Sequence, residues 1–456
     1  MKILFVRPDP SPETIGLQHI MRVEPLELEI LATLVKDCND VMITDMILEN
    51  KSIQYFINKF KPDMFCVTGY ITHIPIMIEY CHIAKNTNEK IITAAGGVYI
   101  EKFPEEIEST YVDYRVVRNA TRVFPLLVDY LKGISAFPAG VLKKGETLNE
   151  TILPGYDFFY PIPDRTLTRK YRKKYFYVFH NKVALIKTSF GCPYKCNFCF
   201  CRKITDDNYF ARPLKEVLEE LAKIREREIY IIDDNFLLSP KRVREFISLI
   251  KEKKINKRYL VFGRADFIAE NPDIIRDFKE VGLRTVLVGL ESFKNEELSG
   301  FVKQTDSNIN YQAVNVLNRY KVECFAAVIT SPSWDKDDFK KAGEILKELN
   351  IKFLNLQPLA PVKGTGIEID DSSLVIDRKD YVRWDLAHVV VRPEKMSLSD
   401  YYQCIIELYL KIIVKPGHLI GYIKYSPAMQ FRMIKGIFKI FRQYRKRISV
   451  VKECAA

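Results

Sequence analysis

The chain alternates short apolar runs with amphipathic stretches in two separate blocks, and this alternation limits the folds that are open to it. In the first block, residues 1–135, apolar runs typical of buried strands lie at 3–6, 41–44, 64–68 and 91–94. Helical periodicity falls between them, at 26–36 and 75–85. Strands that alternate with helices predict a parallel sheet of the doubly wound, Rossmann-like kind.

The second block, residues 181–375, repeats the pattern in six units. Strands are predicted at 183–186, 229–233, 260–264, 285–289, 324–329 and 353–357, with helices between them, for example at 214–227 and 240–254. Six β/α units predict a partial (β/α)6 barrel, whose chemistry sits at the carboxyl ends of its strands. An irregular stretch rich in Pro, Tyr and basic residues, 136–180, is the predicted linker, and a mostly helical region follows at 376–456. The predicted fold class is therefore α/β with two successive domains and a helical tail.

The length and cysteine usage suit a protein of a reducing compartment. The 456 residues are enough for two or three domains with their own cores. The ten cysteines are scattered outside one short run, unlike a disulfide scaffold. The first residues do not resemble a signal peptide, and no apolar stretch reaches the roughly 18–20 residues of a membrane span. We expect a cytoplasmic protein.

The positive charge is concentrated near the carboxyl terminus. Eleven Lys and Arg residues, and no Asp or Glu, lie between Glu407 and Glu453. This segment therefore accounts for eleven units of the chain's net charge of +12. Helical spacing in 429–447 puts apolar side chains on one face, namely Phe431, Ile434, Phe438 and Phe441, and cations on another, namely Lys435, Lys439, Arg442 and Lys446. This pattern suits peripheral contact with an anionic membrane, or a helix packed on the barrel with a solvated basic face. No nucleic-acid-binding module is evident, and we expect no nucleic-acid partner.

Three cysteines lie close together directly after the first predicted strand of the barrel. The run Gly191-Cys-Pro-Tyr-Lys-Cys-Asn-Phe-Cys places Cys192, Cys196 and Cys199 on one loop. Three thiolates suit a [4Fe–4S] cluster, in which they would leave one of the four irons open to a small molecule. Zinc with Cys201 as a fourth ligand is the alternative, although structural zinc usually takes two separated ligand pairs. A disulfide is the weakest reading of the run.

The spacing CxxxCxxC, with the aromatic Phe198 before the last cysteine, resembles the signature of the radical S-adenosylmethionine (SAM) superfamily. An amino-terminal Rossmann-like domain before such a barrel resembles its cobalamin-binding subfamily. The resemblance implies three cofactors: a [4Fe–4S] cluster on the cysteines, SAM and cobalamin. It also implies contacts to SAM from polar residues at later strand ends, which in this sequence are Asp233, Asp234, Arg264, Glu291, Ser292 and Gln357.

The same resemblance implies cobalamin contacts at two strand ends of the first block, Thr68-Gly69 and Gly96-Gly97, where glycines let a backbone approach a flat ligand. Two features depart from the subfamily. Ile47 stands where many members have a cobalt-ligating His, so cobalamin would lack a protein imidazole. The run Arg118-Asn-Ala-Thr121 replaces an acidic, glycine-rich one. A retained domain without cobalamin is the alternative.

The resemblance implies methylation of an unactivated carbon, with electrons from a donor such as flavodoxin or ferredoxin. Residues 7–21 are similar to the start of the hopanoid C-3 methylases, which implies a lipid substrate. A non-methylating radical SAM enzyme that cyclises or couples its substrate, and a non-enzymatic iron–sulfur protein, are the alternatives.

Overall fold

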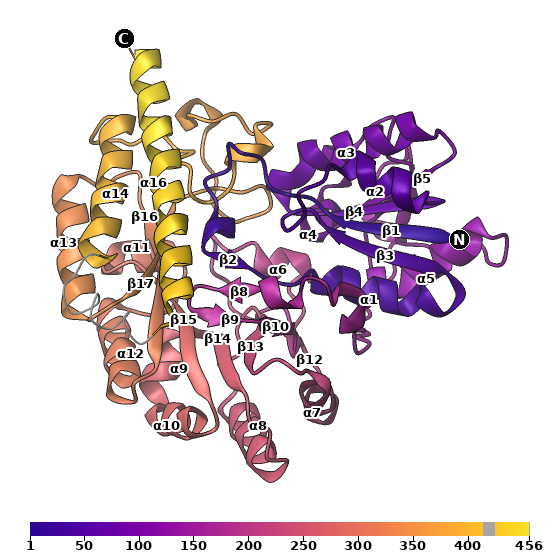
Figure 1. Cartoon of the computed structure of the whole chain (residues 1–456). Coiled ribbons are helices and arrows are strands. Elements are labelled where there is room, and N and C mark those ends of the chain that lie inside the picture. The colour runs from indigo at the N-terminus through magenta and orange to yellow at the C-terminus, as the bar shows by residue number, and fades with distance from the viewer. Residues whose placement is uncertain (414–424, 456) are drawn as a thin grey trace. The chain divides into compact units, whose positions relative to one another are not determined.

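The computed structural model describes residues 1–413 and 425–455, which form two compact units (Figure 1). The chain passes between the units several times. The first unit holds Met1–Thr14, Glu24–Lys174 and Lys379–Asp385, and the second holds Ile15–Val23, Tyr175–Arg378 and Leu386–Ala456. The domain boundaries predicted at 135, 180 and 375 stay predictions.

The first unit is built on a six-stranded sheet of order β3-β1-β4-β5-β6-β7. All neighbouring strands are parallel except β6 and β7. The apolar runs at 3–6 and 64–67 are buried throughout, as strands covered on both faces require, whereas the edge strand β3 is buried only at 43–45. The strands are β1 (Lys2–Arg7), β3 (Asp40–Asp45), β4 (Met64–Thr68), β5 (Ile92–Gly96), β6 (Tyr114–Val116) and β7 (Val141–Lys143).

Five α-helices accompany this sheet, and their apolar faces complete its core. Leu28, Ala32 and Val35 of the first helix pack with Phe124 and Leu127 of the fifth. The helices are α1 (Leu26–Val35), α2 (Ile53–Phe60), α3 (Ile74–Thr87), α4 (Val98–Lys102) and α5 (Ala120–Leu131). Short 3-10 turns lie at η2 (Lys36–Cys38), η3 (Ile71–His73), η4 (Pro104–Ile107), η5 (Glu150–Ile152), η6 (Arg165–Thr168), η7 (Arg172–Lys174) and η9 (Tyr381–Arg383).

The second unit contains a six-stranded sheet in which every neighbouring pair is parallel and the strand order follows the chain. Sequential order with helical crossovers is the topology of a partial barrel. All six carboxyl ends therefore meet at one edge. The strands are β10 (Val183–Ile186), β13 (Glu228–Ile231), β14 (Arg258–Arg264), β15 (Leu283–Glu291), β16 (Glu323–Thr330) and β17 (Phe353–Pro358).

Helices connect and cover these strands, and one large core cluster runs from Ile186 on the first strand to Leu356 on the last. Figure 1 shows these helices ranged along the sheet. They are α7 (Leu214–Lys223), α8 (Pro240–Glu252), α9 (Ala265–Glu270), α10 (Pro272–Glu280), α11 (Asn295–Gly300), α12 (Ser307–Arg319) and α13 (Lys336–Glu348), followed by α14 (Leu398–Ile413) and α16 (Pro427–Ala455).

Small elements complete the second unit. A three-stranded sheet joins β2 (Met21–Arg22), β8 (Phe176–Tyr177) and β9 (His180–Asn181), and a short antiparallel pair joins β11 (Ser189–Phe190) to β12 (Phe210–Ala211). The turn η1 (Leu17–His19) packs on α16 so closely that a Cβ at Gly436 would lie 2.4 Å from the His19 carbonyl oxygen. The remaining helices are α6 (Cys201–Ile204) and η8 (Asp371–Ser373).

The predicted strands and the fold class are confirmed, with ends that differ by one or two residues. The predicted apolar face of the tail is only partly right. Phe431, Ile434 and Phe438 are exposed, whereas Phe441 is half-buried against the core because it lies toward the face that carries buried Tyr444. Of the eleven tail cations, Lys415 and Lys424 lie outside the described residues. No helix among the described residues is long and apolar enough to cross a membrane.

Candidate active site

The predicted cluster cysteines lie on the loop between β11 and β12, which follows the first barrel strand. The loop begins at Gly191, whose φ is +75° and whose Cβ, if present, would lie 2.0 Å from the Asn208 carbonyl oxygen. Only glycine fits such a contact in this conformation. The middle of the loop is tied to the strands' carboxyl edge, because the Asn197 side chain donates to the Gly300 carbonyl (2.8 Å). The loop is therefore held at its start and in its middle.

The cysteine sulfurs occupy a partly buried, electrostatically connected environment. Burial raises the pKa of the Cys192 thiol to about 11, and the neighbouring Cys199 and Cys196 add to the shift. Burial also raises the pKa of Cys196, although the cations Lys303 and Arg264 oppose it. An Arg264 Nη1 lies 3.7 Å from the Cys196 sulfur. Cations directed at a sulfur suit a thiolate ligand, whose negative charge they would stabilise.

Cys201 belongs to the same environment. A hydrogen bond from Cys201 lowers the pKa of the Cys199 thiol despite its burial. All four cysteines of the loop are free, so the disulfide reading is not realised. Among the described residues, no three His, Cys, Asp or Glu side chains stand in an arrangement that could hold a metal ion. The [4Fe–4S] cluster on Cys192, Cys196 and Cys199, and zinc with Cys201, stay predictions from the sequence.

Asp233, predicted to contact SAM, is a buried anchor of the cysteine loop. Its carboxylate accepts hydrogen bonds from the Thr188 backbone N–H (2.6 Å), the Thr188 hydroxyl (2.5 Å) and the Ser189 hydroxyl (2.7 Å). Burial raises the pKa of Asp233, and these hydrogen bonds oppose the shift. Asp234 accepts from the Gly191 N–H (3.0 Å) and holds the loop's first residue. Asp233 and Asp234 therefore hold the start of the cysteine loop in place.

Asn235, directly after this pair in the same motif, is a buried amide that was not among the predicted site residues. Asn235 is only 4% exposed to solvent. Neither its Nδ2 nor its Oδ1 has a hydrogen-bond partner among the described residues. A buried polar group without a partner costs about 1–3 kcal/mol, so such groups usually await a ligand or water. An amide at this strand end offers one donor and one acceptor to a polar cofactor.

Arg264 ends β14 as predicted and is largely engaged within the protein. Its guanidinium makes a two-pronged ion pair with Asp266 (3.0 and 2.7 Å) and donates to the Lys303 carbonyl (2.7 Å). It also stacks on the ring of Tyr194, 3.7 Å from its centroid. Although burial acts against it, the pairing with Asp266 raises the pKa of Arg264. Arg264 thus braces the cysteine loop from the end of β14, which is separated from β10 by β13.

Glu291 ends β15 in a strained conformation. Its φ is +59°, a region that non-glycine residues seldom adopt, and the strand shifts register between Gly289 and Glu291. The buried carboxylate pairs with Lys303 Nζ at 2.8 Å, and a Cβ on Gly289 would lie 2.3 Å from its Oε1. Lys303, only 5% exposed, was missed from the sequence because nothing in its local pattern marks it. The pair brings a carboxylate and a cation to the predicted SAM edge.

The remaining predicted contacts differ in their surroundings. Ser292 is fully buried in a turn, where its hydroxyl bonds Glu297 and accepts from the Lys294 N–H (3.1 Å), so it is placed to shape the loop. Gln357 lies half-buried on β17, paired in register with Ile329. Their contacts with SAM stay predictions.

In the first unit, the candidate cobalamin residues meet at the carboxyl ends of β4 and β5. The chain adds β3 on one side of β1 and β4 on the other, so the strand order reverses between β1 and β4. In such sheets, ligands bind outside the carboxyl ends of the strands at the point of reversal. Gly97, with a φ of +123°, packs on Gly69. A Cβ on Gly97 would lie only 2.4 Å from the Gly69 carbonyl oxygen. These glycines therefore let two loops approach each other. Gly96 and Thr68 sit beside them, with only ordinary contacts for a Cβ at Gly96.

The residues around the two departures from the cobalamin pattern make contacts within the first unit, and Ile47 itself is half-buried. Asp45, two residues before Ile47, is fully buried and its carboxylate pairs with Arg7 at the end of β1 (3.0 Å from Nε). Arg118 stacks 4.0 Å above the Tyr156 ring, and Thr121 donates to the Phe159 carbonyl (2.9 Å). The run from Arg118 to Thr121 thus holds the segment that follows β7.

Two family profiles match the chain. The radical SAM superfamily matches residues 186–354, and the B12 binding domain matches residues 20–128. The first match contains the cysteine loop and all the predicted SAM contacts except Gln357. The second contains Thr68, Gly69, Gly96 and Gly97.

Curated relatives are similar over most of the chain. The hopanoid C-3 methylase of Methylococcus capsulatus is 25% identical, across 88% of this chain and 78% of its own. An uncharacterized methyltransferase of Pyrococcus horikoshii is 24% identical, across 97% and 99%. The anaerobic magnesium-protoporphyrin IX monomethyl ester cyclase of Rubrivivax gelatinosus is 22% identical, across 92% and 78%.

Solved structures share the fold. The radical SAM methyltransferase TsrM from Kitasatospora setae, with cobalamin and a [4Fe-4S] cluster bound, has a TM-score of 0.66 at 15% identity, covering 98% of this chain and 99% of that one. The cobalamin-dependent SAM radical enzyme OxsB has a TM-score of 0.62 at 16% identity, covering 80% and 54%. Both likenesses concern the fold.

Proposed function

The chain belongs to the cobalamin-dependent radical SAM enzymes, and from this premise we propose that it methylates an unactivated carbon of a lipid. The observation that carries the proposal is the cysteine triad on a loop after the first strand of a barrel preceded by a B12-binding domain. The match to a hopanoid C-3 methylase over 88% of the chain supports the substrate class.

Cys192, Cys196 and Cys199 are the residues that would hold the [4Fe–4S] cluster. Together, cluster, SAM and cobalamin supply radical generation and a transferable methyl group when they are bound. Arg264 and Lys303 place positive charge beside the Cys196 sulfur. The chain itself contributes a loop that Asp233 and Asp234 hold in place.

SAM would meet a mixed set of polar groups along the carboxyl edge. The amide of Asn235, which has no partner among the residues that the structure describes, can both donate and accept, and the Glu291–Lys303 pair offers both charges. SAM carries a carboxylate, an amine, hydroxyls and an adenine, so a site with both donors and acceptors fits it. Gln357 and Ser292 are further candidates at the same edge.

For cobalamin, we propose the loops that contain Thr68, Gly69, Gly96 and Gly97. Ile47 cannot ligate cobalt, so a bound cobalamin would have no imidazole from that position. Electron paramagnetic resonance of reconstituted protein in the cob(II)alamin state should show no nitrogen splitting from a protein ligand. A protein that binds no cobalamin under these conditions would contradict the assignment.

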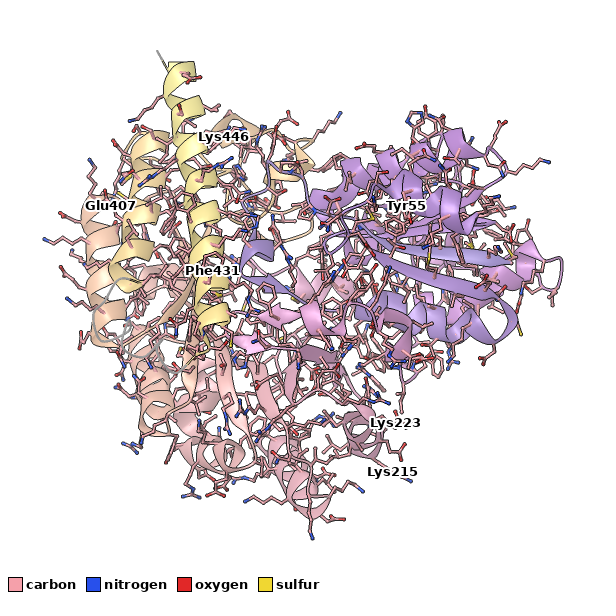
Figure 2. All side chains as sticks on the ribbon, viewed as in Figure 1. Tyr55, Lys215, Lys223, Glu407, Phe431 and Lys446 are labelled. Atoms are coloured by element: carbon pink, nitrogen blue, oxygen red, sulfur yellow. The ribbon has the colours of Figure 1, made fainter. Side chains whose placement is uncertain are left out.

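Membrane contact through α16 is part of the proposal, because the enzyme must reach a lipid substrate at the surface of a membrane. Phe431, Ile434 and Phe438 are 69%, 67% and 67% exposed, and exposed Lys435 and Arg442 lie among them (Phe431 is marked in Figure 2). An apolar stripe among cations complements an anionic lipid surface. Electrons would come from a small redox protein such as flavodoxin or ferredoxin.

The decisive experiment is product mass. Anaerobically reconstituted protein is incubated with SAM, reductant and lipids extracted from cells that lack this chain, and the lipids are compared before and after by mass spectrometry. Methylation adds one CH2 unit, and SAM labelled in its methyl group carries the label into the product. A changed lipid of unaltered carbon count would instead favour ring closure, the activity of the cyclase relative.

A further inference from the structure

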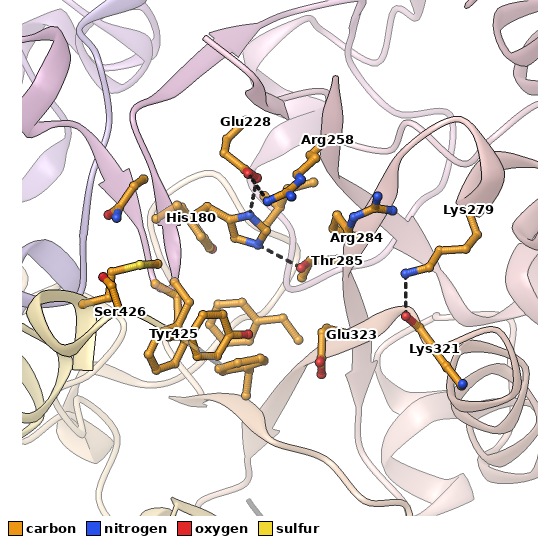
Figure 3. A pocket seen from close by; sticks show the side chains of 18 residues that line it. His180, Glu228, Arg258, Lys279, Arg284, Thr285, Lys321, Glu323, Tyr425 and Ser426 are labelled. Carbon is orange, nitrogen blue, oxygen red and sulfur yellow. Dashed lines mark hydrogen bonds and ion pairs between the residues drawn. The ribbon is translucent and has the colours of Figure 1, made fainter. Parts of the chain in front are cut away.

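A cavity opens at the opposite end of the barrel sheet from the cysteine loop. It has a volume of about 530 Å³ and is lined by residues at the amino ends of the strands, among them Glu228, Arg258, Thr285, Glu323 and Phe353 (Figure 3). The active-site residues lie at the carboxyl ends. Strand β15 alone has nine residues, which separates its two ends by about 26 Å. The cavity is therefore separate from the candidate active site.

One wall of the cavity is aromatic. Phe325 and Phe353 lie with ring centroids 6.2 Å apart, and Phe353 lies 5.8 Å from Phe179. The Phe179 ring is stacked on Tyr425 at 4.0 Å, with an angle of 12° between the rings. Tyr177 approaches Phe325 at 6.1 Å. Such a wall favours a flat apolar ligand of small-molecule size, and the volume falls in the usual range for one.

Another part of the lining is an ordered polar network. His180 joins the Glu228 carboxylate through Nδ1 (2.8 Å) and the Thr285 hydroxyl through Nε2 (3.0 Å), as the dashed lines of Figure 3 show. Arg258 binds the other oxygen of Glu228 at 3.0 Å. Burial alone would raise the pKa of Glu228, but the bonds from His180 and Arg258 outweigh it and lower the pKa. Glu228 is thus a satisfied carboxylate that holds His180 and Arg258 in place.

Cations outnumber carboxylates around the cavity. Among the described residues, the lining has four cations, Arg258, Lys279, Arg284 and Lys321, and two carboxylates, Glu228 and Glu323. Glu323 is already paired with Lys352 (3.2 Å). Arg284 donates to its neighbour's carbonyl, that of Leu283 (2.9 Å), and has no carboxylate partner among the described residues. Burial and the nearby Arg258 lower the pKa of Arg284, although the Glu228 carboxylate opposes the shift. An anion beside Arg284 would relieve this repulsion between cations.

The cavity wall also holds a strained residue. Val178, in the turn between β8 and β9, has a φ of +49°, which is a genuine outlier for a β-branched side chain. The turn is held by the Val178 N–H, which donates to the Ile20 carbonyl (2.9 Å), and by Arg432, which donates to the Val178 carbonyl (3.3 Å). Backbone strain maintained by surrounding contacts is typical of ligand-binding walls. Here it positions Phe179 and His180 at the cavity.

We propose that this cavity binds a small organic anion, with a flat apolar body against Phe325 and Phe353 and a carboxylate or phosphate head at Arg284. Phe325, Phe353 and Arg284, whose guanidinium has no carboxylate partner among the described residues, line one space, and none of them belongs to the candidate active site. The amino ends of barrel strands usually carry contacts for stability. A hollow of this size with an excess of cations is better explained by a ligand.

The test measures binding of phenyl phosphate and benzoate by isothermal calorimetry, with inorganic phosphate as the probe that lacks an apolar body. We expect one site per chain for at least one of the two aromatic anions, and binding at least tenfold weaker for inorganic phosphate. The aromatic anion that binds more tightly identifies the head group. No saturable binding of either aromatic anion would overturn the proposal.

Matched variants locate the site. Arg284→Gln should weaken the aromatic anion about tenfold or more, since a charge-assisted hydrogen bond contributes roughly 1.5–3 kcal/mol. Phe353→Leu should weaken the aromatic anions but leave inorganic phosphate unchanged. Arg276→Gln, an exposed arginine on α10 paired with Asp277, is the control and should bind like the parent. Equal affinities for the Arg284 variant and the control, with both proteins folded by circular dichroism, would refute the site.

Discussion

At the residue scale, the side chains that matter most near the cysteine loop are those whose partners the local sequence does not reveal. Asp233 was predicted to touch SAM, yet its three hydrogen bonds go to Thr188 and Ser189. Asn235, two residues on, has a buried amide without a partner among the described residues. The twist at the end of the strand decides which residue of the motif bonds to the cysteine loop, as Asp233 does, and which is left without a partner, as Asn235 is among the described residues.

Replacing Asn235 separates ligand binding from stability. Asn235→Leu removes a buried amide that costs about 1–3 kcal/mol when unpaired, so the thermal midpoint should hold or rise. Affinity for SAM, measured by equilibrium dialysis on reconstituted protein, should fall at least tenfold. Asn310→Leu is the contrast, because the Asn310 amide donates to the Leu290 and Ser292 carbonyls (2.9 and 3.0 Å) and its loss should lower the midpoint. Unchanged SAM affinity in Asn235→Leu would give this amide a purely structural role.

A buried carboxyl on α1 predicts a pH dependence of folding. Glu29 is fully buried, and burial raises its pKa to about 7, which the Thr168 hydroxyl opposes. Because the folded state holds this proton more tightly than the unfolded chain, its contribution is fully present below about pH 4.5 and is lost as pH rises to about 7. Glu29→Gln, which mimics the protonated form, should gain up to about 3 kcal/mol over the parent at pH 8 and little at pH 4.5. Urea unfolding at both pH values measures this, and an equal difference at the two would contradict it.

At the element scale, single close contacts decide whether a loop or helix can take its place. The cysteine loop depends on Gly191, α16 depends on Gly436 against η1, and the β4 and β5 loops depend on Gly97 against Gly69. In each case the missing Cβ leaves room for a carbonyl oxygen. The periodicity of a helix or strand predicts the element but not which of its residues must be glycine.

Gly191→Ala should disable the cysteine loop. Its Cβ would lie 2.0 Å from the Asn208 carbonyl, so the backbone must shift and the three cysteines with it. We expect iron and sulfide content after reconstitution to fall to less than half of the parent's. Gly133→Ala is a matched control, because Gly133 has the same φ of +75° but nothing within 4 Å of its added Cβ. If both variants retain the parent's cluster absorbance, the close contact is not what shapes the loop.

The exposed stripe of α16 predicts lipid binding. A variant with Phe431→Ser, Ile434→Ser and Phe438→Ser should lose sedimentation with phosphatidylglycerol vesicles, while Val450→Ser, exposed on the same helix away from the stripe, should retain it. Each cation near such a surface contributes about 1 kcal/mol at low salt. Binding should therefore weaken on neutral vesicles and at high salt. A parent protein that ignores anionic vesicles at low salt would leave the stripe without this role.

At the scale of the whole molecule, the chain is interlaced between its two units. Residues 15–23 leave the first unit to pack in the second, and residues 379–385 return to the first, where Tyr381 bonds Glu106. The stretch that resembles the hopanoid methylases, 7–21, is thus divided between the units. Because each unit contains three separate segments of the chain, no single point of cleavage divides the sequence into the two units.

The sequence alone determined the strands and the cysteine motif. Runs such as 64–68 and 183–186 match β4 and β10 because a strand buried on both faces is apolar at every position, a local property. The motif around Cys196 is local too, and it was sufficient to indicate the family. Both needed no knowledge of distant residues.

Only the tertiary structure decided which polar groups meet. Lys303 reaches Glu291, and Arg264 reaches the Lys303 carbonyl and the Cys196 sulfur, across separations of 12, 39 and 68 residues. The cavity at the other end of the sheet likewise gathers His180, Glu228 and Thr285 from three strands. Parallel strands bring such residues to one edge, but the twist of the sheet and the packing of its helices choose the side chains that touch. That choice is made by long-range contacts, and no local pattern in the sequence records it.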